Sequence, residues 1–477
     1  MTLPQVNPRL GESRPTTSLP GDTGTAFVVG PADRGPVDAP VLIRSLAEYV
    51  DIFGPRVSYG WLYDVLDVAF NEGLDHAYVV RTVGPSAVTS SKNLVNASSE
   101  NTLEVKAASP GAWGNKIEVA PVAGVTEGTF HIHISYGGSL LADGVSPELA
   151  DNAAAVAWAA NTSYIRLKDL GKGDPKVQSV TLASGADDRE HITTAVIEEA
   201  LARFTPDLGP GQVAVPGNFA EGVQLAIGAH CGATMRVPVP DFEDTGNAET
   251  LIANCGALRG SSGVKQGGTF GPWDIAPGIA LGTTRIVPPC ARQLGAMARV
   301  DAATGSPDNA AAGDLGKARY VIGLTQTFSD AEREKLTDAG YNVSIIDEGV
   351  PTTYSWRTLA DPVNERGWLP LTTARLMVGL GAGAKKVLKR YMFKKLDETG
   401  HTVSNAQGDI ENEVVKPAYE AEALYGATEA EACQVTVTQQ VNPTNGAIGK
   451  LTATLVAVPT EFAEEIELVV VETNKAL

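Results

Sequence analysis

The chain has 477 residues and a mass of 49.8 kDa, which predicts about two to four domains. Its 37 Lys and Arg residues against 56 Asp and Glu residues give a net charge of −19. This charge argues against a nucleic-acid-binding protein that works through a broad basic surface. Hydrophobic residues make up 43% of the chain, which is enough for large buried cores and too much for a disordered protein.

Cysteine usage and hydropathy narrow the class further. Cys231, Cys255, Cys290 and Cys433 lie far apart and include no CxxC pair. This pattern excludes a disulfide scaffold, disfavours a structural zinc site and indicates assembly in a reducing compartment. No apolar run approaches the roughly 18 residues of a membrane span, and the N-terminus has no apolar core, so we expect neither a span nor a signal peptide.

The first part of the chain reads as an arm followed by an α/β unit. Residues 1–22 carry four prolines and no helical period, which indicates an extended arm or a disordered tail. Apolar strands are predicted at 26–29, 41–43 and 77–80, with helices between the second and the third. A strand, a helix and another apolar strand predict a parallel sheet covered by helices.

The pattern then changes twice. Residues 86–189 show short alternating runs, such as 103–106 and 130–134, separated by Gly-rich turns, which predicts an inserted antiparallel sandwich or small barrel. The α/β rhythm returns at 190–350, where Ser329 and Glu332 form a predicted capping box at the start of a helix.

The last part, residues 351–477, differs again. One long helix is predicted from about 374 to 396, followed by a hairpin of strands 435–438 and 451–456 around the turn 442–446. The apolar run 466–471 is a closing strand, which joins either its own sheet or that of another molecule.

These patterns predict an α/β plus β multidomain fold. Its parts are an N-terminal extended arm (1–22), a discontinuous α/β domain (23–85 and 190–350), an inserted antiparallel β domain (86–189), and an α+β C-terminal domain that includes the terminal strand (351–477).

No catalytic arrangement stands out. His131 and His133 would share one face of a strand and could bind a metal, but no third ligand is evident and a solvated face is favoured. His230 and Cys231 lack a third orienting group, so a small buried Cys231 is favoured over a nucleophile. GxSxG and Walker A motifs are absent. We therefore predict no catalytic residue, no metal and no cofactor.

The predicted long helix carries two unusual features. Small residues at 379–383 lack the setting of a dinucleotide loop and would instead let the helix approach another backbone closely. At about 100° per residue, five cations cover one half of the predicted helix. The other half carries Val387, Leu388, Tyr391 and Met392, and Lys395 also falls on this apolar half. The five cations are Lys385, Lys386, Lys389, Arg390 and Lys394. They form either an ordinary solvated face or a docking face for an acidic partner.

Several segments follow one another in a distinctive order. In chain order they are AFVVGPADRGPVDAPVLIRSLAEYVDIFG, AFNEGLDHAYVVRTVG, SPGAWGNKIEV, GPWDIAPG, GAMARVDAATG, TDAGYNVSII, SWRTLADP, RLMVGLGAGAKKVLKRYMF and VPTEFAEEIELVV. Together they resemble the sheath protein of contractile phage tails and related injection machines. The start lacks that family's usual PGVY-type segment, and SPDNAAAG stands where an APAN-like segment would be expected.

The resemblance implies a non-enzymatic machine part. Copies would stack as a helical tube around an inner tail tube, join by strand addition between terminal arms and C-terminal sheets, and contract to drive the tube through an envelope. Implied partners are further copies, the inner tail tube, the baseplate and the tail terminator, without direct nucleic-acid binding or membrane insertion. The implied location is a virion tail assembled in the host bacterial cytoplasm, and a phage virion is not separable from an injection particle.

The resemblance also assigns site residues. Lys385, Lys386, Lys389, Arg390 and Lys394 would form the tube-docking helix, and Val435, Val437, Ile466, Leu468 and Val470 would take part in strand addition between subunits. The alternative is an α/β hydrolase-like enzyme with a β insertion, which would need a pocket of convergent polar groups. A structural or adhesive surface protein is disfavoured, because the chain lacks a signal peptide and disulfides.

Overall fold

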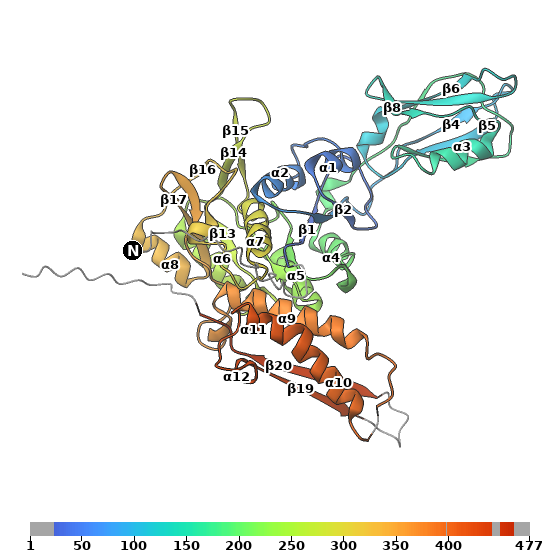
Figure 1. The fold of residues 1–477 in the computed structure, drawn as a ribbon. Helices are drawn as coiled ribbons and strands as arrows, with labels where there is room; N and C mark the ends of the chain where they lie inside the picture. The colour runs from blue at the N-terminus through green and yellow to red at the C-terminus, as the bar shows by residue number, and fades with distance from the viewer. Residues whose placement is uncertain (1–22, 397, 441–448, 462–477) are drawn as a thin grey trace, which may run out of the picture.

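The structure, a computed structural model, describes residues 23–396, 398–440 and 449–461. An α/β body carries a β unit that projects to its upper right and a mixed C-terminal unit that lies beneath it (Figure 1). The predicted arm 1–22, the hairpin turn 442–446 and the closing strand 466–471 lie outside the described residues.

A five-stranded sheet organises the α/β body, in the order β12-β11-β1-β3-β2. Its strands are β12 (Val237–Pro238), β11 (Gln212–Ala214), β1 (Ala26–Gly30), β3 (Ala77–Arg81) and β2 (Val41–Ile43). The first four run parallel, as the sequence predicted, whereas β2 pairs antiparallel with β3 at the edge. Because β1 pairs with β3 on one side and β11 on the other, segments from before and after the β unit share one sheet.

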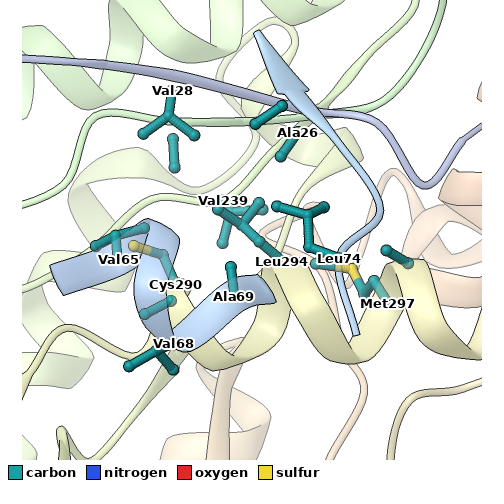
Figure 2. Close-up of a cluster of buried hydrophobic side chains, with 14 of the residues drawn as sticks. Ala26, Val28, Val65, Val68, Ala69, Leu74, Val239, Cys290, Leu294 and Met297 are labelled. Carbon is teal, nitrogen blue, oxygen red and sulfur yellow. The ribbon is translucent and has the colours of Figure 1, made fainter. Parts of the chain in front are cut away.

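Helices cover both faces of this sheet. They are α1 (Leu46–Phe53), α2 (Leu62–Glu72) and α7 (Cys290–Thr304) on one face, and α4 (Thr194–Ala202) and α5 (Glu221–Thr234) on the other. Alternate residues of β1 point to opposite faces. Ala26 and Val28 therefore join the core with α2 and α7 (Figure 2), while Phe27 and Val29 join the core with α4 and α5.

Local signals explain where several helices begin and end. The Ser45 side chain accepts from the Glu48 backbone N–H and so caps α1. Gly73 ends α2 with a φ of 119°, a conformation that favours glycine. The predicted capping box of Ser329 and Glu332 is present at the start of α8 (Asp330–Asp338) and is confirmed.

The body also contains two smaller sheets, of which the one that includes Tyr341 and Val343 packs with α6 (Ala248–Leu258) and α8. One sheet comprises β13 (Thr269–Gly271), β17 (Tyr341–Asp347) and β18 (Val350–Thr353), and the other comprises β15 (Thr284–Val287), β14 (Asp274–Pro277) and β16 (Gly323–Leu324). The predicted boundary after residue 350 falls inside β18, which pairs with β17 of the α/β body. The other domain boundaries remain predictions.

The β unit contains two antiparallel sheets and one helix. The sheets are β4 (Ser91–Val95), β5 (Asn101–Ala107) and β9 (Ile165–Asp169), and β10 (Val180–Thr181), β6 (Ile117–Ala123), β7 (Phe130–Tyr136) and β8 (Ser139–Val145); the helix is α3 (Asn152–Ala159). The two sheets and the helix share one core, to which β5 contributes Leu103, β7 contributes Ile134 and α3 contributes Ala155. The predicted antiparallel texture is confirmed.

A buried arginine fastens this β unit to the body. Arg81, the last residue of β3, forms an ion pair with Asp187 at 3.0 Å and donates to the carbonyl of Pro110 at 2.8 Å and that of Ala32 at 3.0 Å. Its acceptors come from the body and from the β unit, so Arg81 holds the two together. A buried charge is tolerated here because several acceptors surround it.

The C-terminal unit is built from helices and one hairpin. Its elements are α9 (Leu371–Lys389), α10 (His401–Ile410), a π-helical turn (Glu411–Val415), α11 (Lys416–Glu420), α12 (Glu429–Ala432), β19 (Cys433–Gln440) and β20 (Lys450–Ala457). The helices pack on the hairpin around a core of their own (Figure 1). Across the described part of the chain, no helix has both the length and the apolar character to span a bilayer.

Two buried carboxyl groups lie beside α7. Asp241 accepts from the backbone N–H of Cys290 at 3.2 Å, and Asp274 pairs with Arg292 at 3.1 Å. Burial raises the pKa of Asp241 to about 7 and that of Asp274 to about 6, although hydrogen bonds from Cys290 and the charge of Arg292 act in the opposite direction.

This burial predicts a loss of stability as the pH rises. The folded pKa of Asp241 lies above its ordinary value of 3.8, so the folded state holds the proton longer than the unfolded state. The free energy of unfolding should therefore fall by on the order of 2 kcal/mol between about pH 5 and pH 8 through this group. Asp241→Asn should raise the thermal unfolding midpoint at the higher pH and much less at the lower. Equal shifts of the unfolding midpoint at both pH values would contradict the raised pKa of Asp241 in the folded state.

Candidate assembly surfaces of the C-terminal unit

Helix α9 belongs to two cores at once. In its first half, Leu371, Ala374 and Val378 pack into the core of the α/β body. In its second half, Leu380 and Val387 pack into the core of the C-terminal unit. Spacings of three, four and seven residues place each set on one side of a helix. The helix therefore sets the position of the C-terminal unit on the body.

A buried polar cluster fixes α9 to the body. The Arg375 guanidinium donates to Asp301 of α7 at 2.6 Å and to the carbonyl of Pro307 at 3.2 Å. The Thr23 hydroxyl donates to the same Asp301 carboxylate at 2.7 Å. Gln212 of β11 in turn donates to the Thr23 carbonyl at 3.1 Å. The residue that follows the predicted arm is thus held where α7, α9 and β11 meet.

The small residues of α9 face the body at close range. A Cβ atom on Gly379 would lie 3.4 Å from Pro307 Cγ, and one on Gly381 would lie 3.2 Å from Met235 Sδ. The sequence predicted that these glycines allow close approach to another backbone. The nearest neighbours are instead side chains of Pro307 and Met235.

The basic stretch is only partly helical, which corrects the predicted helix 374–396. Helix α9 ends at Lys389, so Lys385, Lys386 and Lys389 lie on its last turns, whereas Lys394 lies beyond it. Backbone bonds of the i→i−3 type tighten the chain after the helix. Phe393 then adopts a φ of +63°, which no α-helix accommodates.

Arg390 differs from the neighbouring lysines because it pairs with carboxylates within the described part of the chain. Its guanidinium pairs with Glu413 at 2.6 Å and with Asp409 of α10 at 3.2 Å. The Tyr391 hydroxyl donates to the same Asp409 at 2.6 Å. Desolvation and this bond raise the pKa of Tyr391 to about 12. Arg390 therefore fastens the helix end to α10, and it is less available to a partner than the sequence suggested.

The predicted hairpin is confirmed. Strands β19 and β20 pair antiparallel, with Val435 opposite Leu455 and Val437 opposite Ala453. Val435 and Val437 are buried in the core of their own unit, so their side chains are already committed. Within residues 23–396, 398–440 and 449–461, no third strand joins this sheet. Additional pairing would therefore use backbone groups along its edges.

The last described residues leave the hairpin beside a groove. The Thr460 N–H donates to the Ala423 carbonyl at 3.1 Å, and Thr460 and Glu461 line a groove of about 700 Å³ together with Tyr354 and Trp356 of the body. Ile466, Leu468 and Val470, predicted for strand addition, lie outside the described residues.

The groups that could carry chemistry lie apart from one another. His131 Nδ1 lies 3.0 Å from the Ser146 carbonyl oxygen, and among the described residues no group of three or more His, Cys, Asp or Glu side chains is placed to hold a metal. Cys231 is buried, as predicted, and burial raises the pKa of its thiol. Burial and Arg236 lower the pKa of His230 to about 4.

The sequence analysis missed the most exposed aromatic side chain of this region. Phe393 is 100% exposed and Met392 is 63% exposed. A signal was present, because a helix continued to residue 396 would place Phe393 about 20° from Lys386, on the basic half. An aromatic residue on that half is out of place on an ordinary solvated helix face.

Comparison with known proteins identifies the fold class. No protein-family model and no curated protein matches the sequence. Among solved structures, the chain is similar to the sheath tail protein Lin1278 from Listeria innocua, with a TM-score of 0.59 and 13% identity over 92% of this chain and 96% of that one. The fold is therefore that of tail sheath proteins, which confirms the predicted resemblance at the level of structure.

Two sheaths of contractile injection systems show the same likeness. The sheath of an extracellular contractile injection system (PVC), in the contracted state, gives a TM-score of 0.55 and 13% identity, with 99% of both chains covered. The helical sheath of the anti-feeding prophage, also in the contracted state, gives a TM-score of 0.53 and 15% sequence identity, with 99% of this chain and 100% of that chain covered.

The Arg375–Asp301 pair generates a prediction about the attachment of α9. Arg375→Met should lower the free energy of unfolding by about 3–5 kcal/mol, because it leaves the Asp301 carboxylate buried without its cation. Hydrogen exchange of α9 should accelerate accordingly. Arg390→Met is the matched control, since it removes an exposed guanidinium from the other end of the same helix. If both variants exchange alike, the buried pair does not hold the unit in place.

Proposed function

We propose that this protein is the subunit of a contractile tail sheath. The observation that carries the proposal is that the likeness to solved sheath structures extends over at least 92% of this chain and includes all three structural units. The role is structural, and no catalytic step is assigned to any residue. Many copies assemble helically around an inner tail tube, and their contraction drives the tube through a target envelope.

Subunits join through their chain ends. The β19–β20 sheet offers backbone donors and acceptors at its edges, and such edges accept an extended segment from a neighbour. Thr23, the first described residue, and Thr460, the last but one, are both hydrogen-bonded to the folded core. Segments 1–22 and 462–477 therefore start from fixed points, and each reaches a neighbouring sheet.

The other partners follow from the same role. Lys385, Lys386, Lys389 and Lys394 face the inner tube, and Arg390 contributes mainly by holding the end of α9. The ends of the sheath meet the baseplate and the tail terminator. The protein belongs to the tail of a virion or a related particle and assembles in the bacterial cytoplasm.

Arm deletion tests this assembly mechanism. Removal of residues 1–22, or of residues 462–477, should abolish long tubes and stacked rings in negative-stain micrographs of the purified protein. The thermal unfolding midpoint of the monomer should change little, because the cores of the body and the C-terminal unit lie among the described residues.

Point substitutions distinguish a loss of strand addition from an effect of shortening the chain. The triple variant Ile466→Asn, Leu468→Asn and Val470→Asn should also fail to form tubes, since alternate residues of an added strand share one face. Thr473→Ala with Asn474→Ala is the control and should assemble normally. Normal tubes from the triple variant would refute the assigned face, and normal tubes from both deletions would refute the arm mechanism.

A further inference from the structure

An exposed apolar knob follows helix α9. It consists of Met392 and Phe393, which are 63% and 100% exposed, and we call these two residues the apolar knob. Phe393 has a φ of +63°, a conformation that bulky side chains adopt rarely and at a cost. An exposed aromatic ring on a strained backbone contributes nothing evident to folding, which points to a role in binding.

The knob is held in place from both sides. On its N-terminal side, Tyr391 is buried and its hydroxyl donates to Asp409 at 2.6 Å. On its C-terminal side, the Thr402 hydroxyl of α10 donates to the Lys395 carbonyl at 2.8 Å. The Lys394 N–H closes the turn by donating to the Tyr391 carbonyl at 3.2 Å. Such anchoring fixes the backbone segment that carries the two apolar side chains, which lowers the entropy cost of binding.

Lysines precede and follow the knob along the chain. They are Lys385, Lys386, Lys389, Lys394 and Lys395, and in the described part of the chain none of them forms an ion pair with a carboxylate. A chain of net charge −19 thus carries a local excess of positive charge around two exposed apolar residues. An apolar centre with a charged rim is the usual anatomy of a protein interface.

The location of the knob suits contact with a central rod. The C-terminal helices lie at the lower end of the molecule in the view of Figure 1, and the β unit projects from the α/β body away from them. In a sleeve of subunits around a rod, one end of an elongated subunit faces inward. The end that carries the lysines is the one suited to an acidic rod.

We propose that Phe393 and Met392 are the apolar anchor through which this protein grips its inner tube, and that the five lysines form the rim. The proposal rests on the proposed sheath function and deepens it, because it defines the chemistry of the partner. The facing surface of the tube has an apolar recess bordered by carboxylates. Affinity comes mainly from the recess, whereas the lysines set the encounter rate and the response to salt.

The test uses preformed tubes of the purified inner-tube protein from the same particle, mixed with the full-length chain and sedimented over a series of salt concentrations. Phe393→Asn tolerates the left-handed backbone but removes the ring. It should weaken binding to tubes about tenfold or more and leave the salt dependence unchanged. Phe393→Trp should retain binding. Lys389→Gln with Lys394→Gln should reduce the salt dependence.

Controls separate this inference from the sheath function itself. Tyr425→Ser removes another exposed aromatic side chain, 71% exposed, from the same unit and should bind tubes normally. If Phe393→Asn binds as the original chain does, the knob is not the anchor, although the sheath function survives. If the original chain neither polymerises nor coats tubes, the proposed function fails and the inference fails with it.

Discussion

Arg375 and Asp301 lie 2.6 Å apart in the interior, and this pair fixes how the C-terminal unit is joined to the α/β body. A buried pair stabilises little compared with apolar residues of the same volume, but it is costly to break and tolerates one geometry. Here it fixes α9 against α7 and also fixes Thr23, where the N-terminal segment enters the fold. A single charged cluster therefore fixes the relative positions of Thr23, the α/β body and the C-terminal unit.

This rigid attachment matters for the proposed function, in which a sheath subunit would change its neighbours while keeping its own fold. Rigid-body movement transmits force only if the joints inside each subunit are stiffer than the joints between subunits. Arg81 plays the same part between the body and the β unit that Arg375 plays between the body and α9. The contacts that we assign between subunits are of another kind, namely added strands and a lysine-rimmed knob. Salt and water weaken the charged ones, so a tube held this way can be released.

The sequence predicted what repeating patterns determine. The apolar strand β1, the alternation in the β unit, the hairpin of β19 and β20, and the capping box at Ser329 all depend on local patterns, and the structure confirms them. The sequence alone could not show that Arg375 would be buried, because a charged residue on a helix is ordinarily exposed. Nor did it locate the end of α9, since KRYMFKK keeps acceptable helical propensity until Tyr391 is drawn onto α10.

That last difference changes the meaning of the basic stretch. On a continuous helix, the lysines would form a straight stripe and the apolar residues would be hidden behind it. With α9 ended at Lys389, the chain turns and leaves Phe393 fully exposed, between Lys389 and Lys394 in the sequence. A purely electrostatic face would hold any acidic surface about equally well, and salt would dissolve the contact. The proposed aromatic anchor would add selectivity for shape, so that the same few residues would recognise one acidic partner and still release it.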